Sequence, residues 1–190
     1  MPMHKTLTAA AFSIGLLAGL SEPARAQTFI TPFAGATFGA DAPATKFSTG
    51  VALTIMGKVA GFEAELGYTP DFFNKSASVV LIGTNNVTSV MGNLLVGVGA
   101  GPVRPYGTVG VGLLRSSVNS GSALFGDVSS NDWGVNAGFG LLVLLSDHLG
   151  LRGDGRYFRS LQDTDPGGPL NLTIGNFDFW RAYGGVTFKF

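Results

Sequence analysis

Charged side chains at alternate positions are the residues of this sequence whose types and spacing could do chemistry. Glu63 and Glu65 are separated by one residue, and Arg152, Asp154 and Arg156 repeat that spacing further along the chain. Side chains at every second position of a strand point to the same face of a sheet. The spacing therefore predicts carboxylate and guanidinium groups gathered on one side of a sheet.

The closing segment, residues 176–190, adds two cations to this set. It alternates between an apolar face and a polar face that carries Arg181 and Lys189. Charges are costly against lipid, and a buried charge without a partner costs several kcal/mol, so these groups should point inward and pair. We predict an interior charge network made of Glu63, Glu65, Arg152, Asp154, Arg156, Arg181 and Lys189.

Two interpretations of this network follow from its position. In the first, the sheet closes into a barrel and the side chains fill and plug it, because a barrel of eight strands is just wide enough for side chains. In the second, a Glu–Arg pair exchanges partners and opens a narrow water path.

Residues that could support catalysis are few. The sequence has no Cys and contains neither G-x-S-x-G nor H-E-x-x-H, the motifs of nucleophile elbows and zinc hydrolases. His148, the only His after residue 26, follows Asp147 in a turn sequence and is expected to be solvated. We therefore expect no enzyme activity, no cofactor and no metal; a lipid A-modifying enzyme is the least favoured alternative.

The N-terminus has the pattern of a secretory signal peptide. Lys5 precedes an apolar run, and Ala24, Arg25 and Ala26 form an A-x-A cleavage pattern. This predicts a signal peptide at 1–26 and one barrel domain at 27–190.

The composition narrows the class of protein. Lys and Arg together number 12, as do Asp and Glu, which gives no basic excess for nucleic acid. After residue 26 no stretch approaches the ~18 apolar residues of a membrane-spanning helix. An apolar, exported chain of this kind favours a transmembrane barrel.

Eight segments of alternating polarity are expected to be strands, and the connections between them are alternately long and short. This pattern predicts an all-β fold, an eight-stranded antiparallel up-and-down transmembrane β-barrel with its long loops at one end. A soluble lipocalin-like barrel is the competing fold, but it would have a polar exterior. The predicted strands are 28–38, 48–56, 60–69, 87–98, 103–114, 132–144, 149–158 and 176–190.

Aromatic residues near the ends of these segments are typical of the girdles at membrane interfaces. The residues so interpreted are Phe29, Tyr68, Tyr106, Trp133, Tyr157, Phe177, Phe179 and Trp180.

The closing segment resembles the last strand of bacterial outer-membrane β-barrels. Its alternating apolar residues end in Phe188 and Phe190, and in that family the terminal aromatic residue belongs to the signal that the barrel assembly machinery reads. The chain as a whole is similar to the small barrels related to outer membrane proteins A and X.

This resemblance implies a location in the bacterial outer membrane and a structural or surface-interaction role. A narrow porin-like channel is the alternative. The implied partners are outer-membrane lipids, lipopolysaccharide and the assembly machinery, with no nucleic acid, and the protein is expected to be a monomer.

Overall fold

The protein folds into eight strands and contains no helix in the part of the chain that the structure describes. The computed structural model describes residues 26–39, 44–72, 85–99, 101–118, 128–161 and 178–190. The strands are β1 (Gln27–Phe38), β2 (Lys46–Met56), β3 (Ala60–Pro70), β4 (Asn85–Gly97), β5 (Val103–Val118), β6 (Val128–Leu144), β7 (Leu149–Ser160) and β8 (Asp178–Lys189).

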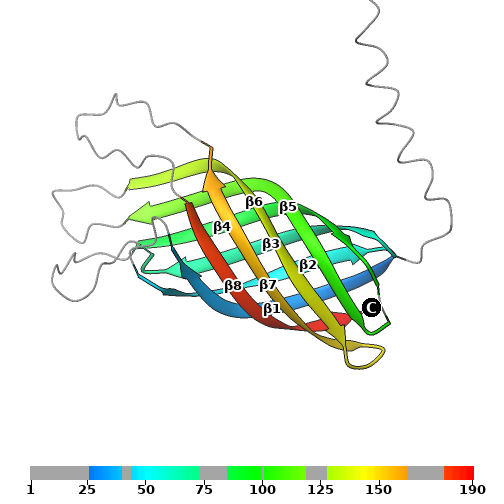
Figure 1. The fold of residues 1–190 in the computed structure, drawn as a ribbon. Coiled ribbons are helices and arrows are strands. Elements are labelled where there is room, and N and C mark those ends of the chain that lie inside the picture. The colour runs from blue at the N-terminus through cyan, green and yellow to red at the C-terminus, as the bar shows by residue number, and fades with distance from the viewer. Residues whose placement is uncertain (1–25, 40–43, 73–84, 100, 119–127, 162–177) are drawn as a thin grey trace, which may run out of the picture.

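Each strand pairs antiparallel with the next, and β8 pairs with β1, so the sheet closes into a barrel (Figure 1). Following cross-strand partners once around the barrel from Thr28 returns to β1 at Phe38, which is a stagger of 38 − 28 = 10 residues. Such a stagger tilts the strands against the barrel axis. The predicted eight-stranded antiparallel barrel is confirmed.

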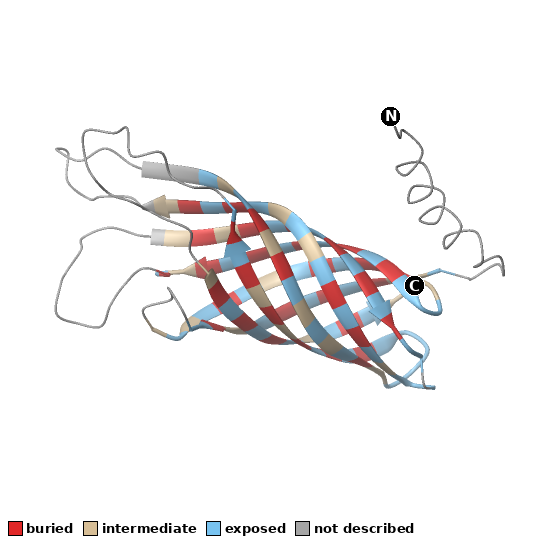
Figure 2. Ribbon diagram, turned by 45° about the horizontal axis from the view of Figure 1, so that its top comes forward, coloured by how far each residue is buried: buried red, intermediate tan, exposed pale blue. Residues whose placement is uncertain are grey.

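Burial alternates along every strand, so one set of side chains fills the interior and the other faces outward (Figure 2). The outward set is strongly apolar: the side chains of Phe62 and Phe139 are each 71% exposed. A soluble barrel would place polar groups there, whereas lipid is as apolar as these side chains. The soluble lipocalin-like alternative is therefore excluded.

Two strands are longer than their hydrophobic pattern predicted. β5 and β6 continue as a pair from Arg115 opposite Asn131 to Val118 opposite Val128. These residues are mostly polar, so the alternation of apolar and polar residues that predicts a strand is absent there, while the backbone ladder continues. The predicted loop at 115–131 was therefore too long.

Pro32 interrupts the seam at which the barrel closes. The β1–β8 ladder pairs Ile30 with Phe188 and resumes at Phe33, because proline has no N–H to donate. The Oγ1 atoms of Thr31 and Thr187 lie 2.9 Å apart in a buried hydrogen bond at this point. A side-chain contact thus bridges the seam where the backbone ladder is missing.

The predicted signal peptide, residues 1–26, lies outside the described residues except for Ala26 and stays a prediction.

Inward glycines make room for long side chains of neighbouring strands. A methyl group on Gly138 would lie 2.8 Å from Cγ of Arg156, and one on Gly140 would lie 2.8 Å from Cε2 of Tyr106. Both separations are shorter than real carbon contacts. The glycines of β6 therefore set the positions of large polar side chains that project into the lumen.

Replacing Gly138 with Ala should destabilise the barrel, because the added methyl group would lie 2.2 Å from the carbonyl oxygen of Gly155 as well as 2.8 Å from Cγ of Arg156, so the backbone of β7 and the Arg156 side chain must shift. We expect the free energy of unfolding to fall by about 1–3 kcal/mol, as in other overpacked interiors. The measurement is urea unfolding of barrel refolded into lipid vesicles. Gly155→Ala is the matched control: nothing lies within 4 Å of its added methyl group, so its effect should stay within about 0.5 kcal/mol.

Candidate functional site

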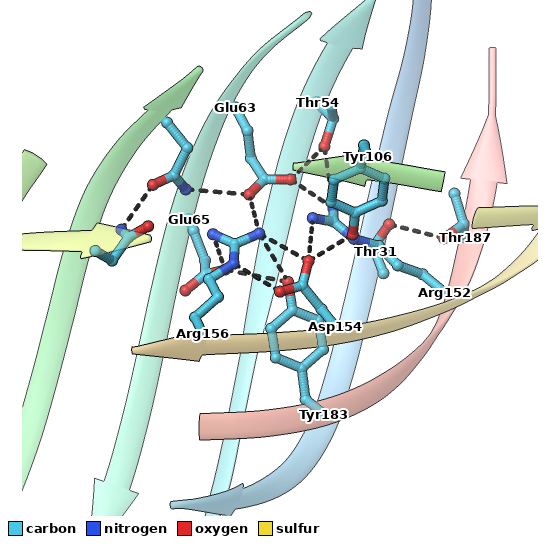
Figure 3. A network of polar contacts seen from close by, with 12 residues as sticks. Thr31, Thr54, Glu63, Glu65, Tyr106, Arg152, Asp154, Arg156, Tyr183 and Thr187 are labelled. Carbon is cyan, nitrogen blue, oxygen red and sulfur yellow. Dashed lines mark hydrogen bonds and ion pairs between the residues drawn. The ribbon is translucent and has the colours of Figure 1, made fainter. Parts of the chain in front are cut away.

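The candidate site is the set of charged side chains in the middle of the lumen, which Figure 3 labels with the exception of Arg181. Six of the seven residues predicted for the interior network are buried there, three carboxylates and three arginines, so their formal charges cancel. β3, β7 and β8 supply them at inward positions, one every second residue. They are Glu63, Glu65, Arg152, Asp154, Arg156 and Arg181.

Glu63 is held by four donors. Its Oε2 lies 2.5 Å from Nη1 of Arg152 and accepts from Thr54 at 2.7 Å, while its Oε1 lies 2.8 Å from Nη2 of Arg156 and accepts from Asn93 at 3.1 Å. Both oxygens of the buried carboxylate are satisfied, which offsets the cost of removing it from water.

Asp154 has a similar environment. It is the next inward residue after Arg152 on β7. Its Oδ1 accepts from Nε of Arg156 at 2.8 Å, and its Oδ2 accepts from Nη2 of Arg152 at 2.9 Å and from the hydroxyl of Tyr106 at 2.5 Å. Tyr106 also accepts from Nε of Arg152 at 2.5 Å. The tyrosine thus joins the carboxylate and the guanidinium in one closed ring of contacts.

Glu65 forms the second acidic centre, closer to the end of the barrel that has the long connections. It is ion-paired with Arg181, and Tyr183 donates to its Oε2 at 3.2 Å. Nη1 of Arg181 donates to Ser89 at 3.0 Å, and the guanidinium lies 4.4 Å from the centre of the Phe158 ring. Hydrogen bonds and a cation–π contact therefore hold Arg181 in place.

Arg156 joins the two centres. Its guanidinium lies 2.8 Å from Glu63, 2.8 Å from Asp154 and 3.0 Å from Glu65, and its side chain is fully buried. No other arginine of the network contacts all three carboxylates in the described part of the chain. The six charges therefore form one connected network.

Apolar side chains close the lumen on both sides of the charges. On the short-turn side lies a cluster of Phe29, Met56, Leu95, Tyr106 and Leu142, and on the side of the long connections lies a cluster of Phe72, Val87, Met91, Leu114, Phe158 and Phe179. A small cavity lies between the cluster on the short-turn side and Arg152. Its volume is only about 10 Å³, roughly the room that one water molecule needs.

The predicted assignment to the aromatic girdles is wrong for three residues. Phe29, Tyr106 and Phe179 are buried in the lumen rather than placed at the membrane interface. Tyr106 and Tyr183, which hold the charges, were missed as members of the network. The available signal was the period of two along a strand, because Tyr183 lies two residues from Arg181 and Tyr106 lies two residues from Thr108, so each pair shares the inward face. Phe177 lies outside the described residues.

The structure does not bring Lys189 into the network. It lies half-buried at the short-turn end of β8 and forms no ion pair with any residue that the structure describes. Without it the lumen charges balance. Phe188 and Phe190 face outward, and the backbone N–H of Phe190 donates to the carbonyl of Thr28 at 2.9 Å.

Other chemistry finds little support among the described residues. They contain no group of His, Cys, Asp or Glu side chains able to hold a metal ion. His148 is exposed in the turn between β6 and β7. No helix in the described ranges is long and apolar enough to cross a membrane.

Comparison with known proteins places the barrel among characterised folds. A family model described as outer membrane protein beta-barrel domain matches residues 7–190. No curated protein matches the chain.

Solved structures with a similar fold include Neisserial surface protein A, at a TM-score of 0.63 and 17% identity, covering 86% of this chain and 97% of that one. A major outer membrane protein from Thermus thermophilus follows at 0.53 and 14%, covering 87% and 100%. Ail, the attachment invasion locus protein of Yersinia pestis, follows at 0.50 and 15%, covering 87% and 98%. At these identities the likeness shows a shared fold.

Proposed function

The chain belongs to the family of outer membrane protein β-barrel domains and lies in the bacterial outer membrane, and from this we propose that it is a closed barrel with a structural or surface-interaction role. Its lumen is plugged by the charged side-chain network, and its activity lies in the surface it presents. The protein is a monomer, and outer-membrane lipids and lipopolysaccharide surround it.

The observation that carries this proposal is the neutral, layered lumen. Each carboxylate of the network contacts at least two donors, and apolar clusters cover the charges on both sides. Opening a water path would require breaking several charge-assisted contacts together with the packing of an apolar layer. Because every carboxylate is engaged by donors, the network favours one closed arrangement.

The arrangement of connections supports a surface role. The strand ends that the longer connections join, in the pairs β1–β2, β3–β4, β5–β6 and β7–β8, lie at one end of the barrel, and the short turns lie at the other, together with the C-terminus (Figure 1). Barrels of this class carry short periplasmic turns and longer extracellular loops. The strand ends that carry the longer connections would then face the outside of the cell.

We assign the assembly signal to Phe188 and Phe190. Both side chains face outward at the periplasmic end, where a protein of the assembly machinery could reach them before the barrel closes. The ladder extends to the last residue, so these residues also mark the seam at which β8 meets β1.

We propose that the protein has no enzyme activity. A lipid A-modifying barrel needs a nucleophile, a base and an orienting acid close together near the outer leaflet. His148 lies at the opposite end, and the lumen carboxylates are engaged by arginines.

Planar-bilayer recording tests the closed lumen. Refolded protein should show no single-channel steps, because the charged layer and both apolar clusters fill the cross-section. Glu65→Ala should also stay closed, since Glu63 and Asp154 still hold Arg156 and the apolar layers remain.

Stable conductance of the wild-type barrel would contradict the proposal and favour the narrow channel. Heat-modifiable gel mobility of the same sample is the control, because it shows that the recorded protein is folded.

A further inference from the structure

An apolar groove crosses the outer surface of the barrel over β5, β6, β7, β8 and β1. It has a volume of about 580 Å³, and its walls include Phe139, Trp180 and Phe38. Its floor is formed by small residues, Gly153 and Gly155 of β7. The groove reaches from the middle of the barrel to its aromatic rim at the loop end.

The floor glycines are not required by the packing of the barrel. A methyl group added to Gly153 or Gly155 would meet nothing within 4 Å, unlike one added to Gly138 on the inward face. Glycine weakens a strand and often marks the close approach of a ligand or another backbone. Here the free space opens outward, so the depth of the groove serves something outside the protein.

A cation lies beyond the loop end of the groove, on the same outward face of β7, with Tyr157 between it and Gly155. Arg159 is exposed on β7, four residues beyond Gly155 and so roughly 13 Å away along the strand. Its cross-strand neighbour Asp178 accepts a hydrogen bond from Tyr157, whose ring packs 5.4 Å from Trp180. Arg159 forms no ion pair with the residues that the structure describes.

We propose that this groove binds lipopolysaccharide, with one acyl chain lying over Gly155 and Gly153 and a lipid A phosphate on Arg159. A guanidinium group binds phosphate through two parallel charge-assisted hydrogen bonds, and the apolar floor and aromatic walls suit an acyl chain. The site rests on the orientation in the proposed function, with the loop end in the outer leaflet.

A second copy of the chain fits this groove less well. In a twofold dimer each copy presents the same surface to its partner, which would bring the two Arg159 side chains towards each other. An anionic lipid instead neutralises that charge, so charge complementarity favours the lipid.

A second outer groove, over β2 to β5, provides matched controls. It is similar in size, about 650 Å³, and Gly92 lies in it. Val90 and Leu113, which are cross-strand partners with exposed side chains, lie between this groove and the rim residue Arg115. Its lining has a single aromatic residue, Phe62, whereas the lining of the first groove has Phe38, Phe139 and Trp180.

Native mass spectrometry of the detergent-extracted full-length protein with bis-phosphorylated lipid A tests the proposal. The wild type should retain one lipid A, and Gly155→Leu and Arg159→Gln should each weaken its binding by about tenfold, which corresponds to one lost charge-assisted or packing contact. Gly92→Leu and Arg115→Gln should bind as the wild type does. Lipid A stripped of its phosphates, and phosphatidylglycerol, should bind the wild type about tenfold more weakly.

Equal lipid A binding by the wild type, Gly155→Leu and Arg159→Gln would overturn the proposal. Binding of phosphatidylglycerol to the wild type as tight as that of lipid A would also overturn it. So would a dimer of the barrel that dissociates when Gly155 is replaced with Leu. Heat-modifiable mobility confirms that each variant is folded. Conductance in the bilayer recording would refute the closed lumen but would not change the measured binding of lipid A. Failure of the closed lumen and failure of the lipid A site can therefore be distinguished.

Discussion

Glu63→Gln is expected to lower the free energy of unfolding by about 3–5 kcal/mol, the usual cost of removing one partner from a buried ion pair. The substitution preserves shape but removes a negative charge that faces Arg152 at 2.5 Å and Arg156 at 2.8 Å. The lumen would then hold one uncompensated positive charge. Urea titration of barrel refolded into lipid vesicles measures the loss.

Thr108→Val is the matched control inside the same lumen. Thr108 is buried, and its Oγ1 has no hydrogen-bond partner in the described structure. Replacing an unsatisfied hydroxyl with a methyl group of similar shape should be neutral or slightly stabilising.

A double variant, Glu63→Gln with Arg152→Met, restores charge balance. Its loss should be smaller than the sum of the two single losses by roughly 0.5–3 kcal/mol, the coupling typical of contacting residues. If Glu63→Gln costs less than about 1 kcal/mol, the lumen is hydrated rather than plugged, and the proposed closed state is wrong.

Removal of Phe190 is expected to reduce outer-membrane levels several-fold while leaving the stability of refolded barrel nearly unchanged. The side chain of Phe190 is 74% exposed, so it contributes little packing, and its backbone supplies one hydrogen bond to Thr28. Its effect should therefore appear during assembly in the cell. Immunoblots of outer-membrane fractions, paired with urea titrations of refolded protein, separate the two effects.

Phe62→Ala is the matched control for the side chain. Phe62 is 71% exposed on the outer surface of β3, so its truncation removes a comparable lipid-facing ring away from the C-terminus. Phe190→Ala should lower the amount of assembled protein and Phe62→Ala should not. Normal levels of both Phe190 variants would remove the targeting role and leave Phe190 as one lipid-facing ring among others.

The barrel fold and the direction of its side chains could be predicted from the order of the amino acids. A strand has a period of two, so Glu63 and Glu65 could be assigned to the face opposite Phe62 and Leu66 without knowing any partner. The alternation of long and short connections then indicated the number and order of the strands. These are local properties, and each can be read from a few consecutive residues.

Which charged side chains contact each other could not be predicted before the strands were paired. Glu65 and Arg181 are far apart in the sequence. Their contact depends on closure of the barrel and on its stagger, which carries the ladder from Thr28 to Phe38 in one circuit. Strand parity does not encode height along the barrel axis, so Lys189 was grouped with charges that lie well above it. Tyr106 was assigned to the membrane interface for the same reason, although Gly140 of β6 leaves it room in the lumen beside Asp154. The depth of each side chain depends on strand tilt and register, which arise only when all eight strands pair.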